Sequence, residues 1–482
     1  MRPLVNAEQE YRAAILPDES LLAMVRPAMD TSSYLSLLDK VSAGEPAVVR
    51  LNKPAAVARG LSLFLVPVRY GQRMMAPHII GYLDASAQHG VTGLEYAYNE
   101  ILSACQGRAE ASFAVNGAGA YLAGEAPTLK NTVANAAGGV VTTLDRDIQE
   151  IVEEVAKTSL LKGAVVVLDP QNGAVLASSS VPTYHPETVA DSIEKADGAL
   201  INRALALYDC GSVFKIVTAA AALENRIPVG RTYTCNGSMT VGNTVFHCHE
   251  RRLGHQTLAM DEAFASSCNL YFIQLAQEVG AEKLLKMTEK LGLTQKLKLA
   301  DGIEAPACVL PTIDELTTPA ALANFAFGQG KLLLSPLHVA RMTAAVTNDG
   351  ILPSLTLVTA TINNAWERTE IPQGRGGERA FSSLTANTLK KMLEMVVTDG
   401  TGRKATLNGE TSAGKTGTAQ TGQQNGDVPV IQSWFTGYFP ADEPRYVISV
   451  IAEDSDSNRT NATACFCEIS NKLIEKEREQ TD

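Results

Sequence analysis

Apolar residues beyond about residue 140 follow two spacings, one typical of helices and one typical of strands. A helical spacing begins after Asp145 and continues through residues 148–155. Strand-like apolar runs follow at residues 164–168 and 174–179, around the turn-forming residues 170–173. This pattern predicts one helix followed by a β-hairpin.

The same two spacings return near the end of the chain. Residues 411–420, 434–439 and 446–451 are strand-like, and residues 461–477 show the apolar face of a helix. We therefore expect two early strands and three late strands to form one mainly antiparallel, five-stranded sheet. Helices from the middle of the chain would flank it, which predicts an α+β fold.

The N-terminal region has a different pattern of apolar residues. Residues 8–29 look helical, and the segment after them has little clear periodicity. A chain of 482 residues is also too long for one ordinary domain. We predict a first domain over residues 1–140 and a second domain over residues 141–482.

Composition and charge exclude some classes of protein. The net charge of −11 argues against a nucleic-acid partner, while 45% hydrophobic and 19% charged residues describe a folded chain. No apolar stretch approaches the ~20 residues that span a bilayer, and no signal peptide is visible at Met1. The expectation is either truncation after a membrane anchor or anchoring by other means.

Eight cysteines leave several interpretations open. Cys235 and Cys248 flank a hairpin-like segment and could be free thiols, a disulfide, or part of a metal site with the histidines nearby. The spacing fits no standard zinc pattern, so the sequence assigns no metal ligands. Cys268 is interpreted as a small buried filler residue.

Ser212 and Lys215 form the first candidate catalytic pair. They are one helical turn apart, which places a nucleophile and a possible base on the same face of a helix. The S-x-x-K pattern also occurs at Ser159, Ser192 and Ser412, but only Ser212 opens a long apolar stretch. A helix cap followed by a surface lysine would explain the pattern without any catalysis.

Two further motifs follow in order, Ser267-Cys268-Asn269 and Lys415-Thr416-Gly417. With S-x-x-K they make the motif set of penicillin-binding proteins and class A β-lactamases. In order and spacing, the chain resembles a class B, monofunctional penicillin-binding protein over about residues 141–477. For residues 1–140 the resemblance implies a non-catalytic domain of an elongated pedestal or dimerisation type. Taken singly, the second motif could be an ordinary turn and the third a polar edge strand.

The resemblance implies roles for each matching residue. Ser212 would be the nucleophile and Lys215 its base, and Ser267 would relay a proton between the lysines and the leaving amine. Asn269 would hold the substrate backbone, and Lys415 would attract a substrate carboxylate. Hydroxyl groups and a bare backbone for substrate binding would come from Thr416, Gly417 and Thr418, and the backbone N–H groups of Ser212 and Thr418 would form the oxyanion hole.

The family also implies a reaction and partners. We expect a D,D-transpeptidase that cross-links peptidoglycan stem peptides, is inhibited by β-lactams and needs no cofactor. It would work beside a membrane glycan polymerase on the outer face of the cytoplasmic membrane. The alternatives are a D,D-carboxypeptidase or β-lactamase, for which Glu304 and Glu315 are candidate water-activating groups, and a noncatalytic β-lactam sensor or polymerase-activating partner.

Overall fold

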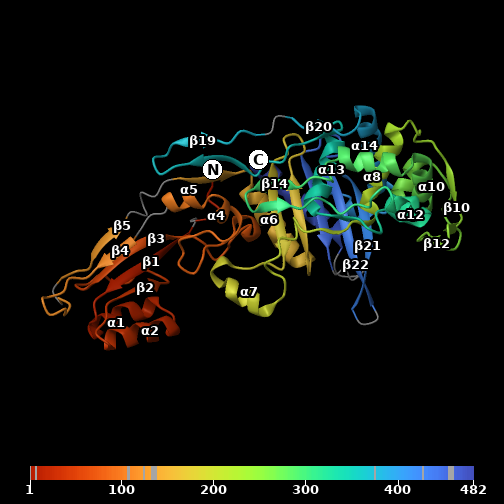
Figure 1. Ribbon diagram of the computed structural model, residues 1–482. Helices are drawn as coiled ribbons and strands as arrows, with labels where there is room; N and C mark the ends of the chain where they lie inside the picture. The colour runs from red at the N-terminus through yellow and green to blue at the C-terminus, as the bar shows by residue number, and fades with distance from the viewer. Residues whose placement is uncertain are drawn as a thin grey trace. The chain divides into compact units, whose positions relative to one another are not determined.

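The computed structural model describes residues 2–5, 8–105, 109–122, 125–131, 138–373, 376–425, 428–453 and 461–481 (Figure 1). The chain divides into two compact units. The first combines residues 1–74, 98–140 and 360–370, and the second combines residues 75–97, 141–359 and 371–482. The sequence predicts a domain boundary between residues 140 and 141. Residues 75–97 precede that boundary but belong to the second unit, and residues 360–370 follow it but belong to the first.

The first unit is built on a small antiparallel sheet with strand order β2-β1-β3. Its strands are β1 (Glu8–Ile15), β2 (Ala47–Leu51) and β3 (Leu61–Val68), and two helices, α1 (Glu19–Val25) and α2 (Thr31–Ser42), contribute to its core. The prediction of a helix from residue 8 is thus wrong for residues 8–15, because Ala13 and Ile15 of the central strand are fully buried between neighbouring strands and helices.

The second unit is built on the predicted five-stranded sheet. Its order is β21-β22-β23-β7-β8, and every neighbouring pair is antiparallel. Two strands come from the start of the unit, β7 (Gly163–Leu168) and β8 (Val175–Val181), and three come from the end, β21 (Ala413–Asn425), β22 (Val428–Phe439) and β23 (Tyr446–Ala452). The predicted α+β arrangement is confirmed.

Helices cover both faces of this sheet. One face packs against α6 (Arg146–Ser159) and α15 (Ala462–Thr481), in a core that includes Val165, Phe435 and Phe466. On the other face, Thr343 of α13 (Pro336–Thr347) hydrogen-bonds Thr436 of β22 at 2.7 Å. Thr436 is the cross-strand partner of Lys415, so the side chains of these two residues lie on the same face of the sheet, the face covered by α13.

Several helices lie between β8 and β21 in the sequence of the second unit (Figure 1). They include α8 (Lys215–Glu224), α9 (Met260–Ala265), α10 (Asn269–Val279), α11 (Ala281–Lys290), α12 (Pro319–Ala326) and α14 (Ser383–Thr398). Short strands between α8 and α9 are β10 (Tyr233–Cys235), β11 (Ser238–Val241), β12 (Thr244–His247) and β13 (Gln256–Leu258).

Smaller elements complete the two units. They are α3 (Pro77–Ile80), α4 (Gly93–Ala97), α5 (Asn99–Ala104), β4 (Ala109–Ser112), β5 (Thr128–Asn131), β6 (Gly139–Thr142), α7 (Val189–Lys195), β9 (Tyr208–Asp209), β14 (Leu297–Ala300), β15 (Ile303–Ala305), β16 (Leu333–Leu334), β17 (Ile351–Leu352), β18 (Val358–Ile362), β19 (Arg368–Glu370) and β20 (Glu378–Arg379). Within the described ranges, no helix has the length and hydropathy of a membrane span.

A buried carboxyl joins α6 to the segment before α3. The Glu153 carboxylate accepts hydrogen bonds from the Ala76 backbone N–H at 2.6 Å and from the Gln149 side chain at 2.8 Å. Burial outweighs these bonds and raises the pKa of Glu153 to about 7. Because this folded-state pKa is above the ordinary value, the contribution of Glu153 to stability is present at low pH and is lost as the pH rises through about 7.

Glu153→Gln should therefore stabilise the protein only at higher pH. We expect a gain of about 2–3 kcal/mol in unfolding free energy at pH 8 and little change near pH 4.5, because glutamine keeps a carbonyl acceptor without a buried charge. Chemical denaturation at the two pH values measures this. The control is Glu154→Gln, whose carboxylate pairs on the surface with Lys472. An equal change at both pH values would contradict the account.

Candidate active site

Ser212 lies in a tight turn that leads into a buried helix. Residues Gly211–Phe214 form one 3₁₀ turn, and α8 continues it from Lys215. The helix can be buried on all sides because residues 216–222 are small or apolar. Ser212 itself is half-buried, so its side chain is held at the start of the helix and stays accessible. The predicted buried helix is present, with its first turn in the 3₁₀ form.

Close backbone packing fixes this turn. Gly211 has a left-handed φ of 55°, and a Cβ added there would lie 2.4 Å from the Thr418 carbonyl oxygen. The Gly211 N–H donates to the Gly328 carbonyl at 3.0 Å, and a Cβ on Gly328 would lie 1.8 Å from the Gly211 carbonyl oxygen. Three chain segments therefore meet behind Ser212, at a distance that only glycine permits.

Lys215 is fully buried and its amine points at the second motif. Its Nζ lies 2.7 Å from the Ser267 carbonyl oxygen, 3.1 Å from the Ser267 Oγ and 2.6 Å from the Asn269 Oδ1. The Phe272 ring centre is 5.4 Å away. The alternative of a helix cap with a surface lysine does not describe this residue, because its side chain is 0% exposed.

Lys415 reaches the same hydroxyl from the sheet. It lies on β21, the edge strand, and its Nζ is 3.0 Å from the Ser267 Oγ. It is also 0% exposed, and the Phe264 ring centre is 5.6 Å from its amine. Ser267 thus places one hydroxyl between two buried lysine amines, in the turn between α9 and α10 where the sequence predicts it.

The two amines have depressed pKa values. Burial lowers the pKa of Lys215 to about 7, although the nearby thiols of Cys268 and Cys248 act in the opposite direction. Burial, and then repulsion from Lys215, lowers the pKa of Lys415 well below its ordinary value. A neutral amine has a free electron pair, so an amine with a pKa of about 7, as in Lys215, can accept a proton near neutral pH.

The rest of β21 forms an open polar edge. Thr418 is exposed and Thr416 is half-buried, whereas Gly417 is buried. A Cβ on Gly417 would lie 3.0 Å from both the Cys210 carbonyl oxygen and Val213, so this strand approaches the Ser212 turn closely. All eight predicted site residues belong to the second unit. The Ser267 hydroxyl connects the three motifs, because it lies within hydrogen-bond distance of the amines of Lys215 and Lys415.

Sequence reasoning missed two contributors. Thr401, in the loop after α14, pairs its hydroxyl with that of Thr416 at 2.7 Å. Gly400 before it approaches the Ala265 carbonyl so closely that a Cβ would lie 2.3 Å away, and the run Gly400-Thr401-Gly402 was the available signal. Gly328 has a structural role, because its contact with the Gly211 carbonyl supports the turn behind Ser212.

The two candidate water-activating carboxylates have other partners. Glu304 pairs with Lys296 at 2.9 Å, and Glu315 pairs with Lys331 at 2.7 Å. Both carboxylates are more than 40% exposed. Their recorded interactions therefore tie them to surface lysines.

Comparison with known proteins finds a family match over more than half of the chain. Residues 163–472 match the family described as the penicillin binding protein transpeptidase domain. The chain belongs to this family. The predicted class B membership and the predicted transpeptidase fold are confirmed, since the most similar solved structures include penicillin binding protein 3.

Relatives and solved structures extend the similarity over most of the chain. Penicillin-binding protein PbpB of Mycolicibacterium smegmatis is 31% identical over 85% of this chain and 64% of its own length. A D,D-transpeptidase domain of a peptidoglycan glycosyltransferase from Eggerthella lenta is 28% identical, with a TM-score of 0.70 over 88% of this chain and 95% of that one.

Penicillin binding protein 3 from Mycobacterium tuberculosis, complexed with aztreonam, is also 28% identical, with a TM-score of 0.71 over 88% of this chain and 92% of that one. The chain spans less than two thirds of the length of the PbpB relative. The two solved structures establish the shared fold.

The packing of Gly328 generates a prediction about the Ser212 turn. Gly328→Ala should lower the rate of acylation by a β-lactam at least tenfold, because the new Cβ would push on the Gly211 carbonyl. Gly330→Ala is the control: Gly330 has nearly the same φ of 85°, but its Cβ would meet nothing closer than 3.4 Å. Both variants carry the strain of a left-handed alanine, so equal rates would show that the contact has no effect.

Proposed function

We propose that this chain is a peptidoglycan D,D-transpeptidase that works through an acyl-enzyme on Ser212. The observation that carries the proposal is the pair of buried amines, Lys215 and Lys415, around the Ser267 hydroxyl at the start of a helix that Ser212 opens. A serine hydroxyl becomes a strong nucleophile only when a base takes its proton. Lys215 is buried one helical turn after Ser212, so it is the candidate for that base.

The first half of the reaction forms an ester. The Ser212 Oγ attacks the carbonyl carbon of the D-Ala-D-Ala bond, and its proton passes to the neutral Lys215 amine. The negative oxygen that develops would be held by the backbone N–H groups of Ser212 and Thr418. Support for this pairing comes from the approach of Gly211 to the Thr418 carbonyl. Losing one such donor typically costs ~2.7–4 kcal/mol of transition-state stabilisation.

The leaving group then needs a proton. The Ser267 hydroxyl, within hydrogen-bond distance of both lysine amines, would pass the proton from Lys215 to the departing D-Ala nitrogen. The C–N bond breaks, D-Ala leaves, and the ester on Ser212 remains. Asn269 would hold the stem-peptide backbone, and Lys415 with Thr416 and Thr418 would bind the substrate carboxylate.

The second half reverses these proton movements with a new nucleophile. An amine of a second stem peptide attacks the ester, loses a proton through Ser267 and Lys215, and frees the Ser212 hydroxyl. A peptide bond forms and the ester bond breaks, so the energy of the first peptide bond is conserved in the cross-link. A β-lactam would acylate Ser212 in the same way, with its ring C–N bond breaking. The resulting ester would be hydrolysed slowly.

The setting follows from the family and is part of the proposal. Cross-linking stem peptides requires access to the wall outside the cytoplasmic membrane, and we place the enzyme there. It would work beside a glycan polymerase, whose product strands supply the stem peptides.

The test is an exchange assay with a synthetic stem pentapeptide ending in D-Ala-D-Ala and a free D-amino acid as acceptor. We expect the wild type to release D-Ala and to form the exchanged peptide, detected by mass spectrometry. Lys215→Met should lower the rate by roughly 10²–10⁴-fold, the usual effect of losing a general base. Ser212→Ala should form no product, while Ser159→Ala, another S-x-x-K serine, should match the wild type.

Other outcomes would select another function. Release of D-Ala without exchange would indicate a carboxypeptidase or a related hydrolase. No reaction by a folded wild type would contradict the proposal and would favour a noncatalytic sensor or a polymerase-activating partner.

A further inference from the structure

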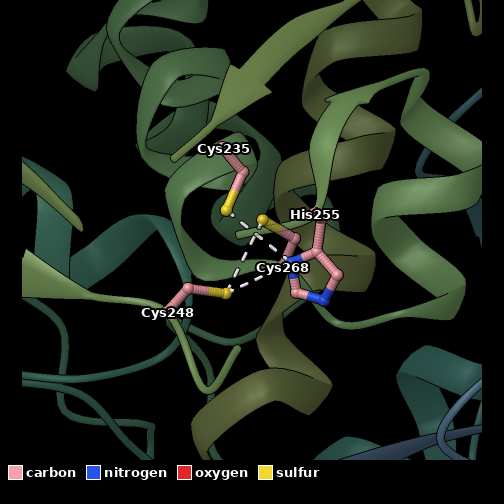
Figure 2. Close-up of side chains that lie close together, drawn as sticks. All are labelled: Cys235, Cys248, His255 and Cys268. Carbon is pink, nitrogen blue, oxygen red and sulfur yellow. Dashed lines mark hydrogen bonds between the residues drawn. The ribbon is translucent and has the colours of Figure 1, made fainter. Parts of the chain in front are cut away.

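Four side chains with metal-binding atoms meet beside the second motif. They are Cys235, Cys248, His255 and Cys268, called the Cys₃His cluster below (Figure 2). The three Sγ atoms and one imidazole nitrogen all lie within 4.8 Å of one another. In Figure 2 the sulfur atoms and the near nitrogen of His255 point toward a common centre.

The cluster joins separate elements of the second unit. Cys235 ends β10, Cys248 follows β12, His255 precedes β13, and Cys268 precedes α10. Strands β10 and β13 pair with Cys235 opposite Gln256, which brings the first and third members together. The ligands thus come from two connected loops and one helix start.

Glycines let the two loops come this close. Gly254, with a φ of 63°, would place a Cβ 1.9 Å from the Cys235 carbonyl oxygen. The Gly237 carbonyl accepts a hydrogen bond from the Cys248 N–H at 2.9 Å. The loops are therefore shaped by backbone contacts on both sides of the cluster.

The distances within the cluster fit a tetrahedral ion. His255 Nδ1 is 3.3 Å from the Cys248 Sγ and 3.6 Å from the Cys235 Sγ, and the Sγ atoms of Cys248 and Cys268 are 4.0 Å apart. Zinc holds sulfur at ~2.3 Å and nitrogen at ~2.0–2.1 Å, which puts tetrahedral ligands roughly 3.5–3.8 Å from each other. A disulfide requires sulfur atoms ~2.05 Å apart, and it could use only two of the three thiols.

Burial also favours a closed site. Cys235, Cys248 and Cys268 are at most 1% exposed, and His255 is half-buried. A single buried cysteine is commonly a small apolar residue. Three cysteines and one imidazole converging on one point make the donor set of a structural Cys₃His zinc site, which has four protein ligands and no open position.

We propose that the Cys₃His cluster binds one Zn²⁺ ion. Three thiols release their protons, the neutral imidazole keeps its own on the far nitrogen, and no electron is transferred. Soft thiolates with one imidazole in a tetrahedron favour Zn²⁺ over the hard cations. The sequence assigns no metal ligands, since the spacing C-x₁₂-C-x₆-H-x₁₂-C is not a standard zinc pattern. Cys268, the last member, lies beyond α9, and only the fold brings it to the other three residues.

The ion would position the turn that carries Ser267 and Asn269. Cys268 lies between these two residues, and both contact the Lys215 amine. Ser267 has a left-handed φ of 56°, a strained conformation for a residue other than glycine, which persists only when its surroundings hold it. A zinc ion that links Cys268 to the β10–β13 loops supplies such a restraint. This effect on acyl transfer rests on the proposed function, whereas zinc binding itself does not.

Metal analysis of the purified full chain tests the proposal. We expect one zinc ion per chain after purification without chelators, and a strong chelator should remove the ion and lower the melting temperature. Cobalt added to the metal-free protein should show the visible absorption of tetrahedral Co²⁺ with thiolate ligands.

Paired variants locate the site. Mutation of a residue that only hydrogen-bonds a metal ligand typically weakens metal binding by roughly 10–100-fold. Cys235→Ser and His255→Gln each remove a ligand itself, so each should weaken zinc binding by at least that much. Cys465→Ser, a buried thiol of α15, and His247→Gln, an exposed imidazole of β12, should retain the ion. Ser212→Ala should also retain it, so loss of acyl transfer and loss of metal are separable results.

Three results would overturn the proposal. The first is a folded wild type that contains no zinc and does not bind cobalt, and the second is a disulfide between Cys235 and Cys248 in the native protein. The third is equal zinc binding by the ligand variants and their controls. If the ligand variants do not fold, the chelator experiment on the wild type decides.

Discussion

Burial of two lysine amines around one hydroxyl is the constraint on which the rest of this structure depends. Two ammonium groups near one another, shielded from water, are unfavourable, so the pKa of at least one must fall. That requirement turns an ordinary lysine into a possible base for Ser212. It also demands a rigid frame, because a small movement would let water reach Lys215 or Lys415 and restore their normal basicity.

The frame comes from elements that are far apart in the sequence. The sheet fixes Lys415, because β21 is in register with β22 and its row of side chains shares the α13 face. The helical layer fixes Lys215, through a helix that is buried on all sides. Glycine contacts bind the Ser212 turn to both. The remaining part, the Ser267 turn, has a strained backbone, and the proposed zinc ion would hold it through Cys268.

Much of this could be predicted from the sequence, where local patterns decide the structure. The five strands of the large sheet and the three motifs followed from apolar spacing and short residue patterns. Residues 8–15 could not be assigned correctly, since their composition suits a helix and only packing between β2 and β3 makes them a strand. Thr401, and the position of Cys268 beside Cys235, Cys248 and His255, were missed for a related reason. Their partners are distant in sequence, and only the folded chain brings them together.

The account's central claim is that Ser212 forms the covalent bond. The most direct measurement is intact-mass analysis, followed by peptide mapping, after incubation with benzylpenicillin. The account predicts a single added penicilloyl mass on the wild type, located on the peptide that contains Ser212 and absent from a folded Ser212→Ala variant. An adduct on another residue, or the same adduct on the variant, would contradict it.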